Sequence, residues 1–227
     1  AGPMNDQLID GAMQGAQRGA ALTQRLLAFA RHQALEPKPV DLAELVQGMG
    51  NLLRRSTGPA VDMHFDLPSG LAAAHIDANQ VELALLNLVV NSRDAMPDGG
   101  RVAISLDEVE TGTVRDLAAG RYLRLSVSDS GTGMDALTLQ KAVEPFFSTK
   151  EVGKGTGLGL SMIHGLAQQL KGALRLFSTP GHGTRAELWL PVADGVPMVV
   201  TSGLQEAASN EKRTAKLLFV DDDFLIG

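Results

Sequence analysis

A run of alternating glycines has the composition needed to bind a phosphate-bearing ligand. In residues 155–160, GTGLGL, glycine occupies every second position, and an amphipathic stretch over 161–170 follows and is predicted to be a helix. Glycine lets the backbone approach a bulky anion, and the start of a helix offers free N–H groups and a positive dipole. The pattern favours a nucleotide-phosphate site, although such a run can also exist only to form a tight bend.

Two asparagines lie four residues apart in a second predicted helix, over residues 79–95, that is otherwise strongly apolar. Its buried face is expected to contain Val81, Leu85, Leu88 and Val89. Side chains at i and i+4 lie one above the other, so the amides of Asn87 and Asn91 can address one ligand or hydrated cation. The alternative is that a buried asparagine only bonds to a loop.

A carboxylate followed by two glycines ends a predicted strand over residues 122–129. The sequence there is Asp129-Ser-Gly131-Thr-Gly133. The aspartate can accept a hydrogen bond from the exocyclic amine of a nucleotide base. The two glycines have no side chains, so the ring of the base can lie close to the backbone. A plain Asp-Gly turn is the competing interpretation.

The remaining elements are predicted from the spacing of apolar residues and from helix-capping and turn-forming residues. Asp41 is predicted to cap a helix, and Phe146 and Phe147 are predicted to anchor a mobile loop, with core packing as the alternative. The buried face of that helix is expected to be Leu42, Leu45, Val46, Met49, Leu52 and Leu53. Strands are predicted over residues 61–67, 72–76, 101–108, 122–129, 173–178 and 184–191, and a short helix over 136–143.

Composition excludes several classes of function. The 227 residues carry a net charge of −6 with no basic block, which argues against a nucleic-acid partner. Cysteine is absent, so a thiolate metal site is impossible, and the five histidines match no ligand spacing. No apolar run is long enough to span a bilayer and no signal-peptide pattern is present, so a cytoplasmic protein is expected.

Four motifs follow one another in a familiar order. They are NLVVN at 87–91, DSGTG at 129–133, EPFFSTK with GTGLGL at 144–160, and GHGT at 181–184. Together they resemble the N, G1, F, G2 and G3 boxes of the sensor histidine kinases, which share the ATP-binding fold of gyrase and MutL. The compact FFSTK segment resembles that of the nitrogen-regulator subgroup. The resemblance implies a Bergerat-type α/β (α+β) sandwich over residues 40–192, with a mixed sheet and one helical layer.

The same resemblance implies where adenine binds. Asp129 would hydrogen-bond the adenine amine, Gly131 and Gly133 would shape the pocket, and Thr184 would support it.

It also implies where the phosphates and the cation bind. Asn91 would hold the Mg²⁺ that bridges the phosphates, Asn87 would assist, and Lys150 would be a nearby positive charge. The phosphate tail would lie against Gly155, Thr156, Gly157, Leu158 and Gly159. Asn87 stands where the ATP-hydrolysing relatives place a glutamate base, and an amide cannot activate water, so ATP should stay intact until a histidine arrives.

The two ends of the chain resemble further parts of a hybrid histidine kinase of bacteria, whose full-length form could be membrane-attached. Residues 4–35 have small and apolar residues at heptad spacing and resemble the second helix of the dimerisation and phosphotransfer hairpin. Residues 193–215 have the composition of a linker. Residues 216–227 resemble the first strand of a receiver domain, with Asp221 and Asp222 matching its acidic magnesium pair.

The implied function is an ATP-dependent protein-histidine kinase core. It would form a homodimer and pass the γ-phosphate to a histidine on the absent first helix, then to an aspartate of a receiver domain in cis or of a response regulator. The chain alone is expected to bind ATP without phosphorylating itself, because no acid-rich acceptor sequence surrounds His32 and the other four histidines fall in the catalytic domain. The alternative is a non-catalytic dimerisation and docking module, which predicts weak or absent nucleotide binding.

Overall fold

The structure is a computed structural model that describes residues 35–112, 117–150 and 155–193. In chain order its elements are β1 (Lys38–Val40), α2 (Leu42–Thr57), β2 (Val61–Asp66), β3 (Ala74–Ile76), α3 (Ala78–Asp94), β4 (Gly100–Thr111), β5 (Gly120–Asp129), α4 (Ala136–Lys141), α5 (Gly159–Gln169), β6 (Ala173–Ser178) and β7 (Thr184–Pro191). The predicted second helix of a phosphotransfer hairpin (4–35) lies outside these residues except for Leu35, and the predicted linker (193–215) except for Ala193. The predicted receiver strand (216–227) lies wholly outside them.

Five strands form a mixed sheet in the order β2-β4-β5-β7-β6. Strand β2 runs parallel to β4, while β4, β5, β7 and β6 pair antiparallel. The register places Val127 of β5 opposite Ala186 of β7, close to the end of β5. The three-residue strand β1 was not predicted, and it pairs with β3 in a separate two-stranded sheet.

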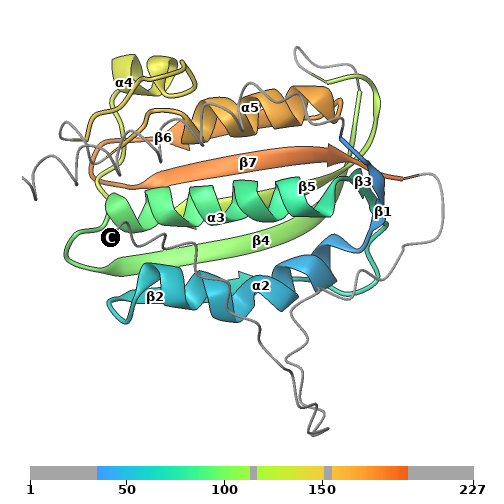
Figure 1. Cartoon of the computed structure of the whole chain (residues 1–227), viewed down its shortest axis with the longest axis horizontal. Coiled ribbons are helices and arrows are strands. Elements are labelled where there is room, and N and C mark those ends of the chain that lie inside the picture. Colours follow the sequence, from blue (N-terminus) through green and yellow to red (C-terminus); the bar gives the residue numbers. More distant parts are fainter. Residues whose placement is uncertain (1–34, 113–116, 151–154, 194–227) are drawn as a thin grey trace, which may run out of the picture.

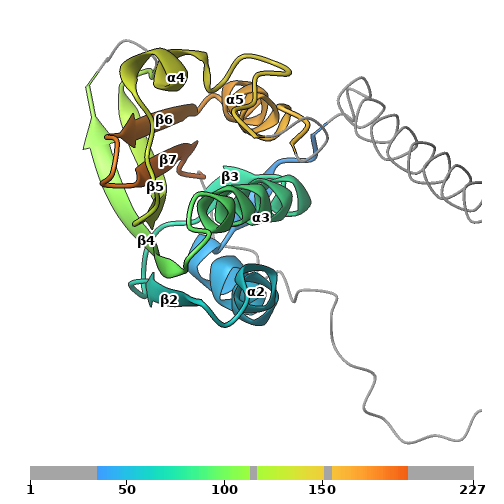
Figure 2. The same cartoon turned by 90° about the vertical axis from the view of Figure 1, so that its left-hand side faces the viewer.

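Helices α2, α3 and α5 form one layer that covers one face of the five-stranded sheet (Figures 1 and 2). Alternate residues of the central strands point into this layer, because side chains of a strand alternate between its two faces. The fully buried side chains include Leu85 and Ile163 of the helices and Ile104, Leu125 and Leu188 of the strands. The expected fold class, an α/β sandwich with a mixed sheet and one helical layer, is therefore confirmed.

Aspartates fix the start of three helices. Asp41 accepts a hydrogen bond from the backbone N–H of Glu44 at 3.0 Å, which confirms it as the cap of α2. Asp77 does the same for α3 through Gln80, and Asp135 caps α4. The start of the helix that carries both asparagines is thus set by its own sequence.

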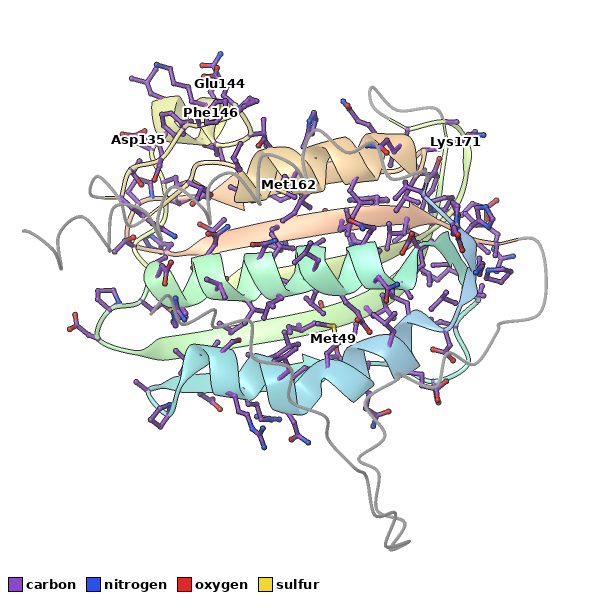
Figure 3. All side chains as sticks on the ribbon, in the orientation of Figure 1. Met49, Asp135, Glu144, Phe146, Met162 and Lys171 are labelled. Carbon is purple, nitrogen blue, oxygen red and sulfur yellow. The ribbon has the colours of Figure 1, made fainter. Side chains whose placement is uncertain are left out.

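One residue of the predicted buried face is exposed. Leu52 keeps 46% of its accessible surface, whereas Met49 and Leu53 of the same helix are buried. In Figure 3, Met49 lies between α2 and α3. Leu52 therefore stands at the edge of the apolar stripe of α2 and not within its buried face. In the part of the chain that the structure describes, no helix combines the length and apolarity needed to cross a membrane.

Candidate functional site

A cavity of about 810 Å³ opens between α3, the end of β5, the start of α5 and the segment that follows α4. Its lining includes eleven of the twelve residues predicted to bind ATP, namely Asn87, Asn91, Asp129, Gly133, Lys150, Gly155, Thr156, Gly157, Leu158, Gly159 and Thr184. The twelfth, Gly131, is buried, and its N–H donates to Asp129 of the lining. The fold therefore brings together residues that four separate motifs contribute, while Asp221 and Asp222 lie outside the described residues.

The carboxylate at one end of the cavity is held by two backbone donors. Oδ1 of Asp129 accepts hydrogen bonds from the N–H groups of Gly131 and Thr184, both at 3.0 Å. The hydroxyl of Thr184 lies 2.8 Å from that of Ser178 on the next strand. Both bonds use Oδ1, and no residue that the structure describes donates to Oδ2 of Asp129, so this oxygen can accept from a donor on a ligand.

Close backbone approaches explain the glycines around this carboxylate. A Cβ on Gly131 would stand 2.7 Å from the carbonyl oxygen of Ala95, at the end of α3. Gly133 has a φ of 66° and a Cβ there would overlap the backbone of Thr179. A side chain at either position would push Asp129 or its neighbours out of place.

The asparagine stripe of α3 faces the first turn of α5. The amide nitrogen of Asn87 donates to the carbonyl of Leu83 at 3.0 Å, so its oxygen points away from the backbone of its own helix. A Cβ on Gly159 would lie 3.6 Å from Nδ2 of Asn91 and 3.9 Å from Oδ1 of Asn87. The positive end of the α5 dipole and both amides therefore border the same part of the cavity, where an anion is favoured.

Lys150 contacts this stripe. Its Nζ lies 2.6 Å from Oδ2 of Asp94 and 3.4 Å from Oδ1 of Asn91. Asp94 was not among the predicted site residues, although its position three residues after Asn91 places it on the same face of the helix. Partial burial raises the pKa of the Asp94 carboxyl, but hydrogen bonds from Lys150 and Arg93 outweigh this and hold that pKa below its usual value.

The two phenylalanines before the glycine run differ. Phe147 lines the cavity, whereas Phe146 is 61% exposed and has a φ of 66°. The backbone N–H of Phe146 donates to the carbonyl of Gly157 at 2.9 Å, which joins the segment before the glycine run to the run itself. Figure 3 shows the Phe146 side chain at the outer surface beside α4. The prediction that both rings act as anchors is therefore wrong for Phe146.

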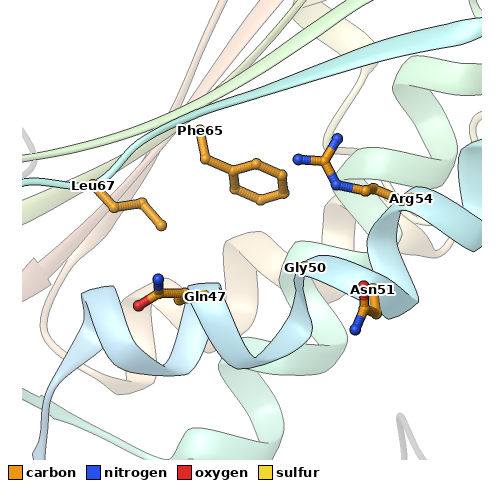
Figure 4. A pocket seen from close by; sticks show the side chains of 6 residues that line it. All are labelled: Gln47, Gly50, Asn51, Arg54, Phe65 and Leu67. Atoms are coloured by element: carbon orange, nitrogen blue, oxygen red, sulfur yellow. The ribbon is translucent and has the colours of Figure 1, made fainter.

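A second cavity, of about 430 Å³, lies between α2 and the edge strand β2 (Figure 4). Its lining is Gln47, Gly50, Asn51, Arg54, Phe65 and Leu67. The Arg54 guanidinium stands 5.0 Å from the centre of the Phe65 ring and donates to the carbonyl of Met63 at 3.0 Å. None of the lining residues belongs to the four motifs, so the larger cavity is the candidate site.

Comparison with known proteins shows the family of the chain. The family described as "Histidine kinase-, DNA gyrase B-, and HSP90-like ATPase" matches residues 76–194, more than half of the chain. The chain belongs to this family. Within it, the residues that the structure describes form the ATP-binding catalytic domain of a histidine kinase.

Similar curated proteins are sensor kinases. The chain is 38% identical over 221 residues to the sensor kinase CckA of Brucella abortus. The aligned region covers 92% of this chain but only 23% of CckA. It is 29% identical to the sensor histidine kinase ZraS of Escherichia coli O157:H7, over 85% of this chain and 40% of that protein. The chain thus spans well under half the length of these relatives.

Solved structures share the fold. Full-length ShkA in complex with AMPPNP matches with a TM-score of 0.65 and 22% identity, over 82% of this chain and 39% of that one. The catalytic domain of the histidine kinase ThkA, in a nucleotide-free form, matches with a TM-score of 0.54 and 23% identity, over 69% of this chain and 98% of that one.

Proposed function

We propose that the larger cavity binds ATP and that the chain supplies the catalytic core of a protein-histidine kinase. The observation that carries this proposal is the convergence, in one cavity, of a backbone-held aspartate, an asparagine stripe and a glycine-rich helix start. A nucleotide needs a base-reading group at one end of its site and an anion site at the other. Both kinds of group line this cavity.

At the base end, Oδ2 of Asp129 accepts a hydrogen bond from the exocyclic amine of adenine. Two backbone donors already hold Oδ1, so the carboxylate is oriented before the ligand arrives. Gly133 and Thr184 border the space into which the ring slides. A guanine, whose carbonyl stands where adenine has its amine, would meet the acceptor Oδ2 with another acceptor.

At the phosphate end, the backbone of residues 155–159 and the positive end of α5 receive the phosphate tail. The amide oxygen of Asn91 borders this end of the cavity, and an amide oxygen is a ligand that Mg²⁺ accepts. When bound, Mg²⁺ would supply charge neutralisation for the phosphates, with Asn91 as its protein ligand and Asn87 beside it. Positioning and charge neutralisation are the main contributions that phosphoryl transfer needs from a protein.

The reaction is transfer of the γ-phosphoryl group to a histidine. A neutral ring nitrogen attacks the γ-phosphorus, the bond to the bridging oxygen breaks, and ADP leaves with that oxygen. Because Asn87 cannot take a proton from water, the site favours a nucleophile that needs no activation by this position. The chain by itself binds ATP without phosphorylating itself, since none of its five histidines stands in an acid-rich acceptor sequence.

The wider assignment extends the proposal to the rest of the chain. Residues 4–35 form the second helix of a dimerising hairpin, 193–215 a linker, and 216–227 the start of a receiver domain with Asp221 and Asp222. The parent protein is then a cytoplasmic or membrane-attached hybrid kinase of the nitrogen-regulator-like subgroup. Its partners are a second copy, and a receiver domain in cis or a separate response regulator.

Calorimetric titration of ATP with Mg²⁺ tests the site. Asp129→Asn replaces the acceptor Oδ2 by an amide that keeps the shape, and we expect affinity to fall at least about tenfold, since a buried polar contact is lost. Asp66→Asn, at the exposed end of β2, removes the same charge elsewhere and should leave affinity unchanged.

The chemistry is tested by adding a separate fragment that carries the first helix of the proposed hairpin, with its acceptor histidine. Acid-labile phosphate on that fragment, dependent on Asp129, supports the kinase. If the wild-type chain binds no nucleotide, the ATP site is refuted and the docking module is favoured instead.

A further inference from the structure

Asp94 is bound by two cations at once, one on each oxygen. Oδ1 accepts from Nε and a terminal nitrogen of Arg93, at 2.9 and 2.6 Å, and Oδ2 accepts from Nζ of Lys150 at 2.6 Å. Its side chain keeps 25% of its accessible surface. The carboxylate is therefore held in one orientation at the mouth of the cavity, with Oδ2 directed at the lysine.

Arg93 ties this carboxylate to the helical layer. Its second terminal nitrogen donates to the carbonyl of Ser56, near the end of α2, at 2.8 Å. Fixed in this way, Asp94 is a rigid anchor for Lys150, which comes from a segment 56 residues further along the chain.

The ammonium of Lys150 has two possible anionic partners in the proposed site. In the described structure it pairs with Asp94 and also lies 3.4 Å from Oδ1 of Asn91. A phosphate tail bound at residues 155–159 would present a second, larger negative charge to the same ammonium. One lysine nitrogen cannot satisfy both partners fully.

We propose that Asp94 is a positioning residue that holds Lys150 against Asn91 in the nucleotide-free protein and competes with the phosphate tail for it. This inference rests on the proposed ATP site. Nucleotide binding then includes an exchange, in which Lys150 leaves Asp94 for phosphate. Asp94 lowers the affinity for nucleotide by the strength of the ion pair that must be broken.

The first arm of the test uses no nucleotide. Thermal unfolding is measured for wild type, Asp94→Asn, Lys150→Gln and the double variant. If the two residues form the pair, the fall in Tm of the double variant is smaller than the sum of the two single falls. Any effect of Asp94→Asn through Arg93 occurs with and without Lys150, so it cancels in this comparison. Additive shifts would overturn the inference.

The second arm measures nucleotide affinity in the same four proteins. Asp94→Asn should bind ATP with Mg²⁺ about two- to fivefold more tightly than wild type, which is the range expected for losing a partly exposed ion pair. Lys150→Gln should bind more weakly, and adding Asp94→Asn to it should give no gain. A gain that persists without Lys150 would mean simple repulsion between Asp94 and phosphate, and no gain in either background would mean no competition; either result refutes the proposal.

Asp98→Asn is the matched control, because it removes a negative charge from the exposed turn just after α3. Its Tm change should add to that of Lys150→Gln in the double variant, and its affinity for ATP should equal that of wild type. If the wild-type chain binds no nucleotide, the proposed function fails, while the first arm still decides whether Asp94 holds Lys150.

Discussion

Glu82 on α3 is a half-buried acid whose surroundings favour the neutral form. Burial raises the pKa of its carboxyl above the ordinary value of 4.5. Asp94, twelve residues later on the same helix, differs: burial raises the pKa of its carboxyl too, but hydrogen bonds from Lys150 and Arg93 prevail and lower it. One helix thus carries two carboxyl groups whose contributions to stability depend on pH with opposite sign.

Glu82→Gln should stabilise the protein at pH 7, because it removes a charge whose desolvation disfavours the folded state. We expect a gain below about 1 kcal/mol, measured by urea unfolding. The gain should shrink as the pH falls through the raised pKa towards 4.5, since the wild-type carboxyl then becomes neutral. A gain of the same size at pH 4 and pH 7 would contradict this reasoning.

Asp94 behaves in the opposite way. The stability that its ion pair contributes is present above the ordinary pKa of 3.8 and is lost as the pH falls from there through the lowered pKa of the folded state.

The turn between β6 and β7 is the element that places Thr184 on Asp129. Gly181 and Gly183 in this turn have φ values of 76° and 83°, where a side chain is strained. A Cβ on Gly183 would overlap the carbonyl oxygen of Asp129, whereas nothing lies within 4 Å of one on Gly181. Only one of the two glycines is therefore needed for a close approach to the site.

Gly183→Ala should destabilise the protein by about 1–3 kcal/mol and weaken nucleotide binding, because the turn must move away from Asp129. Gly181→Ala has a similar backbone strain without the overlap, so it should cost less and leave the affinity unchanged. Thermal unfolding and calorimetric titration of both variants check this. Equal loss of affinity in the two would show that turn strain, rather than contact with Asp129, matters.

The main core of the described residues lies between the sheet and its helical layer, and a second, smaller cluster contains Tyr122 and Trp189. Central strands β5 and β7 contribute Leu125 and Leu188, both fully buried, and the three helices lie over them. In contrast, Leu137 on α4 is 72% exposed. A cavity at the centre of the sheet should weaken every helix contact together.

Leu125→Ala should therefore lower the free energy of unfolding by about 2–5 kcal/mol in a single cooperative transition, as expected for a large-to-small change in a core. Leu137→Ala should change it by less than about 0.5 kcal/mol. Urea unfolding followed by circular dichroism measures both. Two separate transitions in Leu125→Ala would indicate that the core is divided.

Local sequence was sufficient for most elements, while the roles of the predicted site residues stay predictions; the structure shows that eleven of the twelve line one cavity. The period of apolar residues set α2, α3 and every strand of the large sheet, and Asp41 indicated the start of α2, because these signals depend on neighbours a few residues away. The glycines and the asparagine stripe were found in the same way, since each motif is contiguous or spans one helical turn.

Only the tertiary structure decided which distant groups meet. The bond between Thr184 and Asp129 joins residues 55 apart, and the ion pair of Lys150 with Asp94 joins residues 56 apart. The exposure of Leu52 and of Phe146 likewise depends on what lies beside them. Periodicity describes one element at a time, whereas these contacts follow from the strand order β2-β4-β5-β7-β6 and from the helix layer across it, which no local pattern encodes.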